Sequence, residues 1–380
     1  MTAPTPPGPS ARQVSGVGPD GRFLLSVLVK RTYTFDTTGR CTRAADLPLT
    51  ELPVVDPETP GLLLSDSDLY PYKPRTDVIV IGHAYAPRHV TSFEAALTTG
   101  THTKRILVLG DRRASMSPDG TITLEPPAPI DSAPLTFERA YGGADAAACA
   151  RHGNPMTGLA EHVPEEPMLA RVNPYAYPRN PNGRGFLLEA TRAAVEALAL
   201  PNLEDPADRL TADRLAVGTL DRWPAQPLPA APAWVSHAWF PRVAYLGFLP
   251  ADRTLPIAEV TLGALPQSLL AASPGQTTMD LGFANGAPAG LQLPHLNGAE
   301  TLTLTNLHRG RRDLRIHLPG DRPALWTDGR KGKRGDTDPV IHTLVIEPDE
   351  DRLSIVWRGS CPALRPYTAD ELATMPFWID

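Results

Sequence analysis

The sequence predicts a mainly β fold, a β-rich α+β protein with antiparallel sheets, long Pro/Gly-rich loops and few helices. Proline supplies 43 of the 380 residues and glycine another 30, whereas an average chain is about 5% proline. Proline lacks a backbone donor and fixes φ, so helix interiors and central strands exclude it. Apolar residues alternate with polar ones over short runs, which is typical of half-buried strands. A mostly helical fold is excluded.

The N-terminal part begins with a segment that has too few apolar residues to fold. Residues 1–20 are rich in Pro, Gly and Ser and are predicted to be flexible. Phe23 to Phe35 is predicted to be a long strand, because Val27, Val29 and Tyr33 fall on one face. Turn-forming residues at 36–40 then indicate a hairpin. Further strands are predicted at 77–81, 104–109 and 121–124.

Loops dominate the middle of the chain. Periodicity disappears between residues 126 and 184 and again between 201 and 232. Loops of this length are uncommon in compact domains unless they are functional or flexible. One helix is predicted from Leu187 to Leu200, since its apolar residues share one face and Pro201 ends it.

The C-terminal third shows the clearest alternation. Strands are predicted at 234–240, 301–307, 314–318, 340–346 and 352–357. The last two flank Glu347-Pro-Asp-Glu-Asp351, whose composition suits a tight turn and therefore predicts a hairpin. A last helix is predicted to start at Thr368, with Glu371 completing a capping box. We expect an N-terminal β-rich region over 21–230 and a C-terminal antiparallel β region over 231–380, or one continuous unit.

Composition excludes several partners and compartments. With 36 Lys and Arg against 42 Asp and Glu, the net charge of −6 argues against nucleic-acid binding, which needs a basic surplus. No apolar run reaches the roughly 20 residues of a membrane helix, and the first residues show no signal peptide. Three widely spaced cysteines, Cys41, Cys149 and Cys361, fit a reducing compartment. These features predict a soluble, cytoplasmic protein that does not insert into membranes.

Catalytic signatures are missing from the sequence. There is no phosphate-binding loop, no Gly-x-Ser-x-Gly and no His-Glu-x-x-His. Ser65-Asp-Ser-Asp68 resembles the start of a calcium loop, but the glycine that permits the sharp turn is missing. The sequence therefore predicts no enzyme, no metal site and no cofactor.

Several compact motifs instead join aromatic residues, arginine and turn formers. Arginine can bind several carbonyl groups or one carboxylate at once, so these motifs either bind a partner or organise the long loops, and we favour the second interpretation. The candidate residues are Lys73, Arg75, Asp77, Arg139, Tyr141, Arg179, Asn180, Arg184, Trp239, Arg242, Asn285 and Gln292.

Taken together and in this order, the motifs resemble a bacterial family known as domain of unknown function 2169. The similar segments are residues 68–82, 104–112, 138–143, 179–185, 200–206, 239–242, 283–292 and 345–359. Genes of this family lie in type VI secretion clusters, beside those for the VgrG spike and PAAR tip proteins. The resemblance implies a non-enzymatic adaptor or chaperone that binds a cognate effector in the cytoplasm and helps to load it onto the spike. Its implied partners are a type VI effector protein and VgrG, a PAAR protein or both.

Two other functions remain open. The protein could be a hydrolase-like enzyme with a non-standard site built from His83, Asp77 and Arg75 near a strand end. It could also be an immunity protein that neutralises a neighbouring toxin, since both binding roles rest on the same interface physics.

Overall fold

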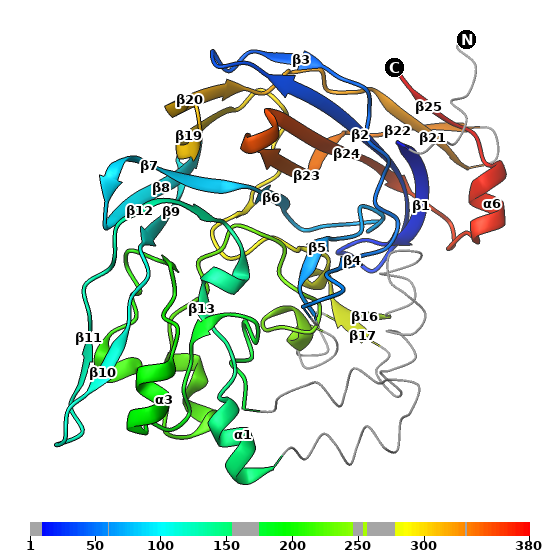
Figure 1. The fold of residues 1–380 in the computed structure, drawn as a ribbon. Coiled ribbons are helices and arrows are strands. Elements are labelled where there is room, and N and C mark those ends of the chain that lie inside the picture. Colours follow the sequence, from blue (N-terminus) through cyan, green and yellow to red (C-terminus); the bar gives the residue numbers. More distant parts are fainter. Residues whose placement is uncertain (1–9, 60, 154–174, 246–253, 257–277, 331–332) are drawn as a thin grey trace.

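The computed structural model describes residues 10–59, 61–153, 175–245, 254–256, 278–330 and 333–380. The fold is mostly β, with two large sheets that contribute to one hydrophobic core (Figure 1). Within these ranges, no helix is long and apolar enough to cross a membrane.

The larger sheet has seven strands in the order β1-β2-β24-β23-β6-β18, with β3 paired to β2. All neighbours are antiparallel except β6 and β23, which run parallel. The strands are β1 (Ala11–Val17), β2 (Phe23–Phe35), β3 (Cys41–Arg43), β6 (Thr76–Val80), β18 (Gln292–Leu293), β23 (Val340–Glu347) and β24 (Arg352–Pro362).

The second sheet has five antiparallel strands in the order β15-β9-β8-β19-β20. They are β8 (Ser92–Thr99), β9 (His102–Leu109), β15 (Leu203–Glu204), β19 (Thr301–His308) and β20 (Arg311–His317). Both large sheets combine strands from before and after residue 230.

The seven-stranded sheet is buried on both faces. Val27 and Val29 of β2 belong to the main core, which also contains Leu302 of the five-stranded sheet. Leu28 and Val356 point to the opposite face and join a second cluster. Burial on both faces accounts for β24, in which every residue from 353 to 359 is buried, Ser354 and Arg358 included.

A third cluster forms a lobe built mostly from loops, which we call the loop lobe (residues 112–125, 137–153 and 175–228). Its core includes Tyr141, Tyr177, Phe186 and Val195. In Figure 1 this lobe, with α1 and α3, lies below the two large sheets. Its helices are α1 (Ala146–His152), α3 (Arg192–Ala197), η1 (Phe137–Arg139), η3 (Ala212–Arg214) and η4 (Leu220–Ala225), and its strands are β10 (Ala114–Met116), β11 (Ile122–Leu124), β13 (Tyr141–Gly142) and β14 (Arg184–Gly185).

Short elements complete the described structure. The strand pairs are β4 (Val54–Val55) with β5 (Leu63–Ser65), β7 (His83–Val90) with β12 (Ile130–Pro134), and β16 (Thr254–Pro256) with β17 (Thr278–Asp280). A three-stranded sheet joins β22 (Lys333–Asp336), β21 (Leu325–Arg330) and β25 (Phe377–Ile379). The remaining helices are η5 (Arg242–Tyr245), η7 (Leu281–Ala284), η8 (Pro348–Glu350) and α6 (Ala369–Thr374).

The β-rich class and the best local predictions are confirmed. Strands β23 and β24 form the expected hairpin around η8, where Asp351 adopts a left-handed conformation with φ of 49°. The predicted capping box is present at α6, because Thr368 accepts from the Glu371 amide and the Glu371 carboxylate accepts from the Thr368 amide.

The helix predicted over 187–200 is much shorter in the structure. Thr191, which interrupts the apolar face, is the N-cap and its hydroxyl accepts from the Ala194 amide at 3.2 Å. Leu187 and Leu188 instead use their carbonyls to accept from the amides of Val217 and Gly218. Their apolar spacing therefore reflects packing in the loop lobe and not a helical face.

Two further segments differ from the sequence-based expectation. The sequence predicts a flexible segment that includes residues 11–17, but these residues form β1, which pairs with β2. The side chains of Val14 and Val17 in β1 are buried. The strand predicted at 234–240 is absent, and the segment is an irregular turn. Trp234 and Trp239 are buried in the main core, and that burial produces the apolar pattern without a strand. Part of the long predicted loop, residues 154–174, lies outside the described ranges.

Candidate functional site

The candidate residues occupy three places in the structure. The first set lies in and around a buried ionic network beneath the loops that cover the seven-stranded sheet. The second connects the turns of the loop lobe. The third is a pair of half-buried arginines, one of which lines a cavity. The sets are Lys73, Arg75, Asp77, Trp239, Arg242, Asn285 and Gln292, then Tyr141, Arg179 and Asn180, then Arg139 and Arg184.

The centre of the first set is a fully buried ion pair between Lys73, which precedes β6, and Asp77 on β6. The ammonium of Lys73 lies 2.8 Å from Oδ2 of Asp77 and donates to the Thr343 hydroxyl at 3.0 Å. It also faces the rings of Tyr70 and Trp234, 5.7 Å from each centroid. A buried charge requires such partners, because an unpaired one loses its hydration without compensation.

Asp77 also holds the loop that follows η7. Its carboxylate accepts from the Asn285 side chain at 2.9 Å and from the amides of Gly286 and Ala287 at 2.9 and 3.1 Å. The Asn285 side chain donates to the Arg75 carbonyl as well, while the Arg75 side chain is exposed. The Gln292 side chain closes the same loop by donating to the Ala287 carbonyl at 2.7 Å. These contacts organise the loop and use the acceptor capacity of Asp77.

A second buried ion pair joins distant parts of the chain. Arg242 lies 2.8 Å from Oδ2 of Asp66 and donates to the carbonyls of Val235 and Phe283. His237 lies 3.0 Å from the other Asp66 oxygen. Burial by itself raises the pKa of Asp66, but the charge of Arg242 and the hydrogen bond with His237 outweigh it and hold that pKa well below its usual value. Arg242 therefore holds separate loops together. The Trp239 ring packs edge-on against the Phe137 ring, with their centroids 5.2 Å apart.

The second set holds the turns of the loop lobe. The side chain of Asn180 donates to the carbonyls of Phe137 and Tyr141 at 2.8 and 3.0 Å. The Tyr141 hydroxyl donates to Gln226 at 3.1 Å. Arg179 lies over the Trp223 ring at 4.8 Å, so all three candidate residues stabilise loops.

Arg139 and Arg184 are arranged differently. Each donates to the same atom, Oδ1 of Asn202, at 3.3 and 3.5 Å. Asn202 is fixed in place, because its Nδ2 donates to the Leu109 carbonyl and to Oδ1 of Asp111. Among the described residues, no carboxylate oxygen lies within 4.0 Å of either guanidinium group. Burial and the neighbouring charge of Arg139 lower the pKa of Arg184.

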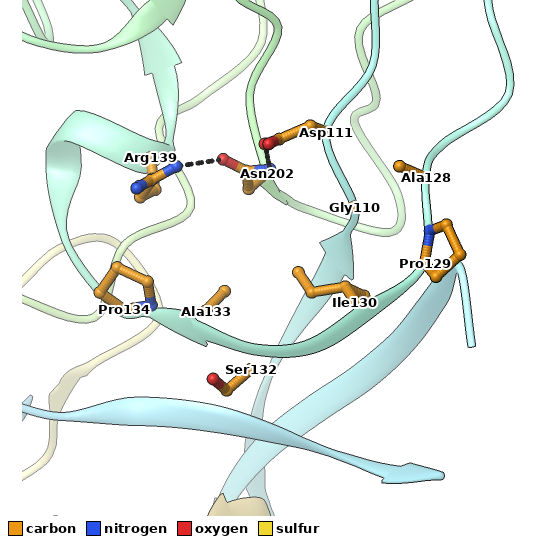
Figure 2. Close-up of a pocket in the computed structure, with 10 residues that line it drawn as sticks. All are labelled: Gly110, Asp111, Ala128, Pro129, Ile130, Ser132, Ala133, Pro134, Arg139 and Asn202. Atoms are coloured by element: carbon orange, nitrogen blue, oxygen red, sulfur yellow. Dashed lines mark hydrogen bonds between the residues drawn. The ribbon is translucent and has the colours of Figure 1, made fainter. Parts of the chain in front are cut away.

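A cavity of about 180 Å³ is lined by Arg139 and Asn202, but not by Arg184. Figure 2 shows Arg139, Asn202 and Asp111 on one side, opposite Ile130, Ala133 and Pro134 of β12. A wider hollow of about 680 Å³ shares Asp111 and Ala128 with the cavity and is lined by Arg184. Among the described strands, β12 pairs with β7 alone.

Apolar side chains are exposed on the β4–β5 hairpin and the residues just before it. Leu52, Val54, Val55 and Leu64 are 46–50% exposed. We call these four residues the hairpin patch. Several exposed apolar side chains on one hairpin are a feature of protein–protein contact sites.

The residues of the hydrolase hypothesis do not form a common site. Asp77 is engaged by Lys73, and Arg75 is exposed. His83 lies 2.7 Å from Asp349 on the surface. None of the three lines the cavity beside Arg139.

The two carboxylates of the calcium-like motif have protein partners. Asp66 is paired with Arg242, and Asp68 lies 2.7 Å from the Lys30 ammonium. In the described part of the chain, no three His, Cys, Asp or Glu side chains are grouped as metal ligands.

Asp66 and His237 are the network residues that sequence reasoning missed. Both lie two residues before a motif-bearing segment, but 171 positions separate them, and neither has a distinctive neighbour that indicates the other. The motifs contain several arginine and lysine residues, and a buried cation needs a carboxylate partner. This was the one signal in the sequence that pointed to further acidic residues in the network.

The geometry defines a two-sheet β protein with a buried ionic network, exposed apolar hairpin and an arginine-bearing cavity. The chain belongs to a family described as an uncharacterized protein conserved in bacteria, the domain of unknown function 2169, whose model matches residues 20–358. Comparisons with curated proteins and with solved structures find no match.

Proposed function

We propose that this protein is a non-enzymatic adaptor or chaperone that binds a cognate effector in the cytoplasm and helps to load it onto the VgrG/PAAR spike of a type VI secretion system. Membership in the family supports a bacterial setting for this role. The hairpin patch is the observation that carries the proposal, because it offers an apolar surface on an otherwise well-packed scaffold.

The scaffold suits recognition of one partner. Buried ion pairs fix the shape of the loops that they join, because electrostatic interactions are stronger in the protein interior than in water. A preorganised surface loses less conformational entropy on binding than a flexible one. Specific complexes bury on the order of 1,600 Å², so the hairpin patch forms the apolar centre of a larger contact area.

In this mechanism the hairpin patch covers apolar surface of the effector until the spike is reached. Contacts with the spike or tip then compete for the effector and release it. An adaptor of this kind needs no catalytic group, because the free energy for transfer comes from the difference between two interfaces.

A double substitution in the hairpin patch tests this proposal. The Val54→Lys/Leu64→Lys variant places two charges on side chains that are about half exposed, so folding is retained. We expect at least a tenfold loss of the effector and spike protein that co-purify with the tagged protein. The matched control is Leu364→Lys, which changes an apolar side chain that is 76% exposed at another site. Equal recovery with the hairpin variant, the control and the wild type contradicts the proposal.

Deletion of the gene separates the adaptor from an immunity protein. An adaptor predicts loss of effector export while the cells stay viable. Self-intoxication of the deletion strain contradicts the adaptor role and favours immunity.

A further inference from the structure

We propose that Arg139 and Arg184 bind the carboxylate of an acidic side chain, glutamate or aspartate, from the protein partner. The assignment to a protein carboxylate rests on the adaptor function proposed above. The binding of a carboxylate at this place rests on the geometry of the two arginines and the cavity.

The two guanidinium groups are short of acceptors. Each arginine side chain carries five N–H donors, yet in the described structure each uses one, and both are directed to the same Asn202 oxygen. The distances of 3.3 and 3.5 Å exceed the usual range of such bonds. Two like charges thus converge on a neutral amide oxygen, an arrangement that an added anion stabilises.

The surrounding charge favours a singly charged ligand. Asp111 lines the cavity, and the charges of Asp111 and Glu138 act on Arg184 together with that of Arg139. The wider hollow adds Arg112 and Arg113 and the carboxylates of Glu125 and Glu196, and Arg112 is already paired with Glu204 at 2.5 Å. With that pair set aside, three arginines stand beside four carboxylates, so a monoanion, which meets less repulsion, suits the site better than a doubly charged phosphate.

The size and lining of the cavity indicate a side chain. Its volume of about 180 Å³ lies below the roughly 300 Å³ of small-molecule sites. Ile130, Ala133 and Pro134 supply an apolar wall opposite Arg139 and Asn202 (Figure 2). The methylene groups of glutamate can pack on this wall while the carboxylate reaches the Arg139 guanidinium and, where the cavity meets the wider hollow, that of Arg184.

Arginine-selective NMR of the full-length protein tests the site directly. The probe is N-acetyl-L-glutamate N-methylamide, and the glutamine analogue is its uncharged control. We expect saturable shifts of the Arg139 and Arg184 Nε–H signals with the glutamate probe, and at least tenfold weaker binding of the glutamine probe. Equal binding of the two probes overturns the proposal, as does tighter binding of inorganic phosphate than of the glutamate probe.

Substitutions distinguish the site from general electrostatics. Arg139→Gln and Arg184→Gln are each expected to weaken the glutamate probe about tenfold. Arg22→Gln, at an arginine whose side chain is 84% exposed in the β1–β2 turn, is expected to leave it unchanged. Circular dichroism verifies that each variant is folded.

Asp111→Asn gives a test that unfolding cannot imitate. The new amide oxygen can still accept from Asn202, while a competing negative charge is removed. The glutamate probe should then bind about threefold more tightly. Unchanged or weaker binding to a folded Asp111→Asn protein overturns the proposal.

Co-purification assigns the carboxylate to the partner. Arg184→Gln should reduce recovery of the effector that the wild-type protein captures. Probe binding that is lost without any change in effector recovery overturns the assignment to the partner and leaves the adaptor function intact. If the wild type captures no protein, the adaptor function fails, whereas the probe titration still decides whether the arginines bind a carboxylate.

Discussion

Replacing Lys73 by methionine should destabilise the protein far more than removing a surface ion pair. The change deletes the contacts of the ammonium with Asp77 at 2.8 Å and Thr343 at 3.0 Å while keeping most of the side-chain volume. The carboxyl group of Asp77 then stays buried without its ammonium partner, with three N–H donors from Asn285, Gly286 and Ala287. Breaking a buried pair from one side costs about 3–5 kcal/mol.

We expect the lower end of that range, because the three remaining donors still stabilise the Asp77 carboxylate. A loss of about 3 kcal/mol lowers the folded-to-unfolded ratio by about two orders of magnitude. For a chain of this size, an m-value of about 3 kcal/mol/M in urea places the midpoint about 1 M lower.

Urea unfolding followed by tryptophan fluorescence and circular dichroism measures this shift. Arg151→Met is the control, since Arg151 and Glu189 are paired at 2.7 Å with side chains 38% and 44% exposed. An exposed pair contributes less than about 1 kcal/mol. The Lys73→Met/Asp77→Asn double variant should lose less stability than the sum of its single changes, because no unpaired charge is left. Equal shifts of the urea midpoint for Lys73→Met and Arg151→Met would contradict this prediction, as would a double variant whose loss equals the sum of the two single losses.

Two further predictions concern acid and a backbone contact. Burial first, and then the charges of Lys73 and Arg358, hold the pKa of His342 well below its usual value, and neither of its ring nitrogens has a hydrogen-bond partner in the described structure. Below about pH 6.5 the unfolded chain binds a proton at His342 that the folded protein does not, so this residue should lower stability by about 1 kcal/mol between pH 7 and 5.5. The urea midpoint of His342→Leu should therefore fall less over this pH range than that of the wild type. An equal fall would contradict a neutral, buried His342. Gly142 has φ of +149°, and a Cβ there would lie 2.1 Å from the Asn180 carbonyl oxygen. Gly142→Ala should therefore lower the free energy of unfolding by at least about 2 kcal/mol. The control Gly120→Ala, where φ is +87° and the space is open, should lower it by about 1 kcal/mol. Similar urea midpoints for the two variants would contradict the close contact at Gly142.

The local parts of the fold were predictable where pattern and turn chemistry agreed. The β23–β24 hairpin combines alternation with Pro348 and acidic turn residues, and α6 begins at a complete capping box. The helix near 187–200 was overextended, because helical spacing of apolar residues also arises when a loop packs on a core. Thr191 marked the true start of the helix and was interpreted as an interruption.

Some residues of the buried network were predictable from the sequence, but Asp66, His237 and the arrangement were not. The motifs identified Lys73, Asp77 and Arg242 as special, yet their burial depends on strands that pair across most of the chain. The convergence of Arg139 and Arg184 on Asn202 depends on the parallel pairing of β13 with β14. Short-range spacing carries no information on such pairings, which only the folded topology determines.

Affinity co-purification of the wild-type protein from its native bacterium, followed by mass spectrometry, tests the central claim most directly. The adaptor account predicts recovery of one effector together with VgrG or a PAAR protein. Recovery of the protein alone, as a folded species with neither partner, would contradict it.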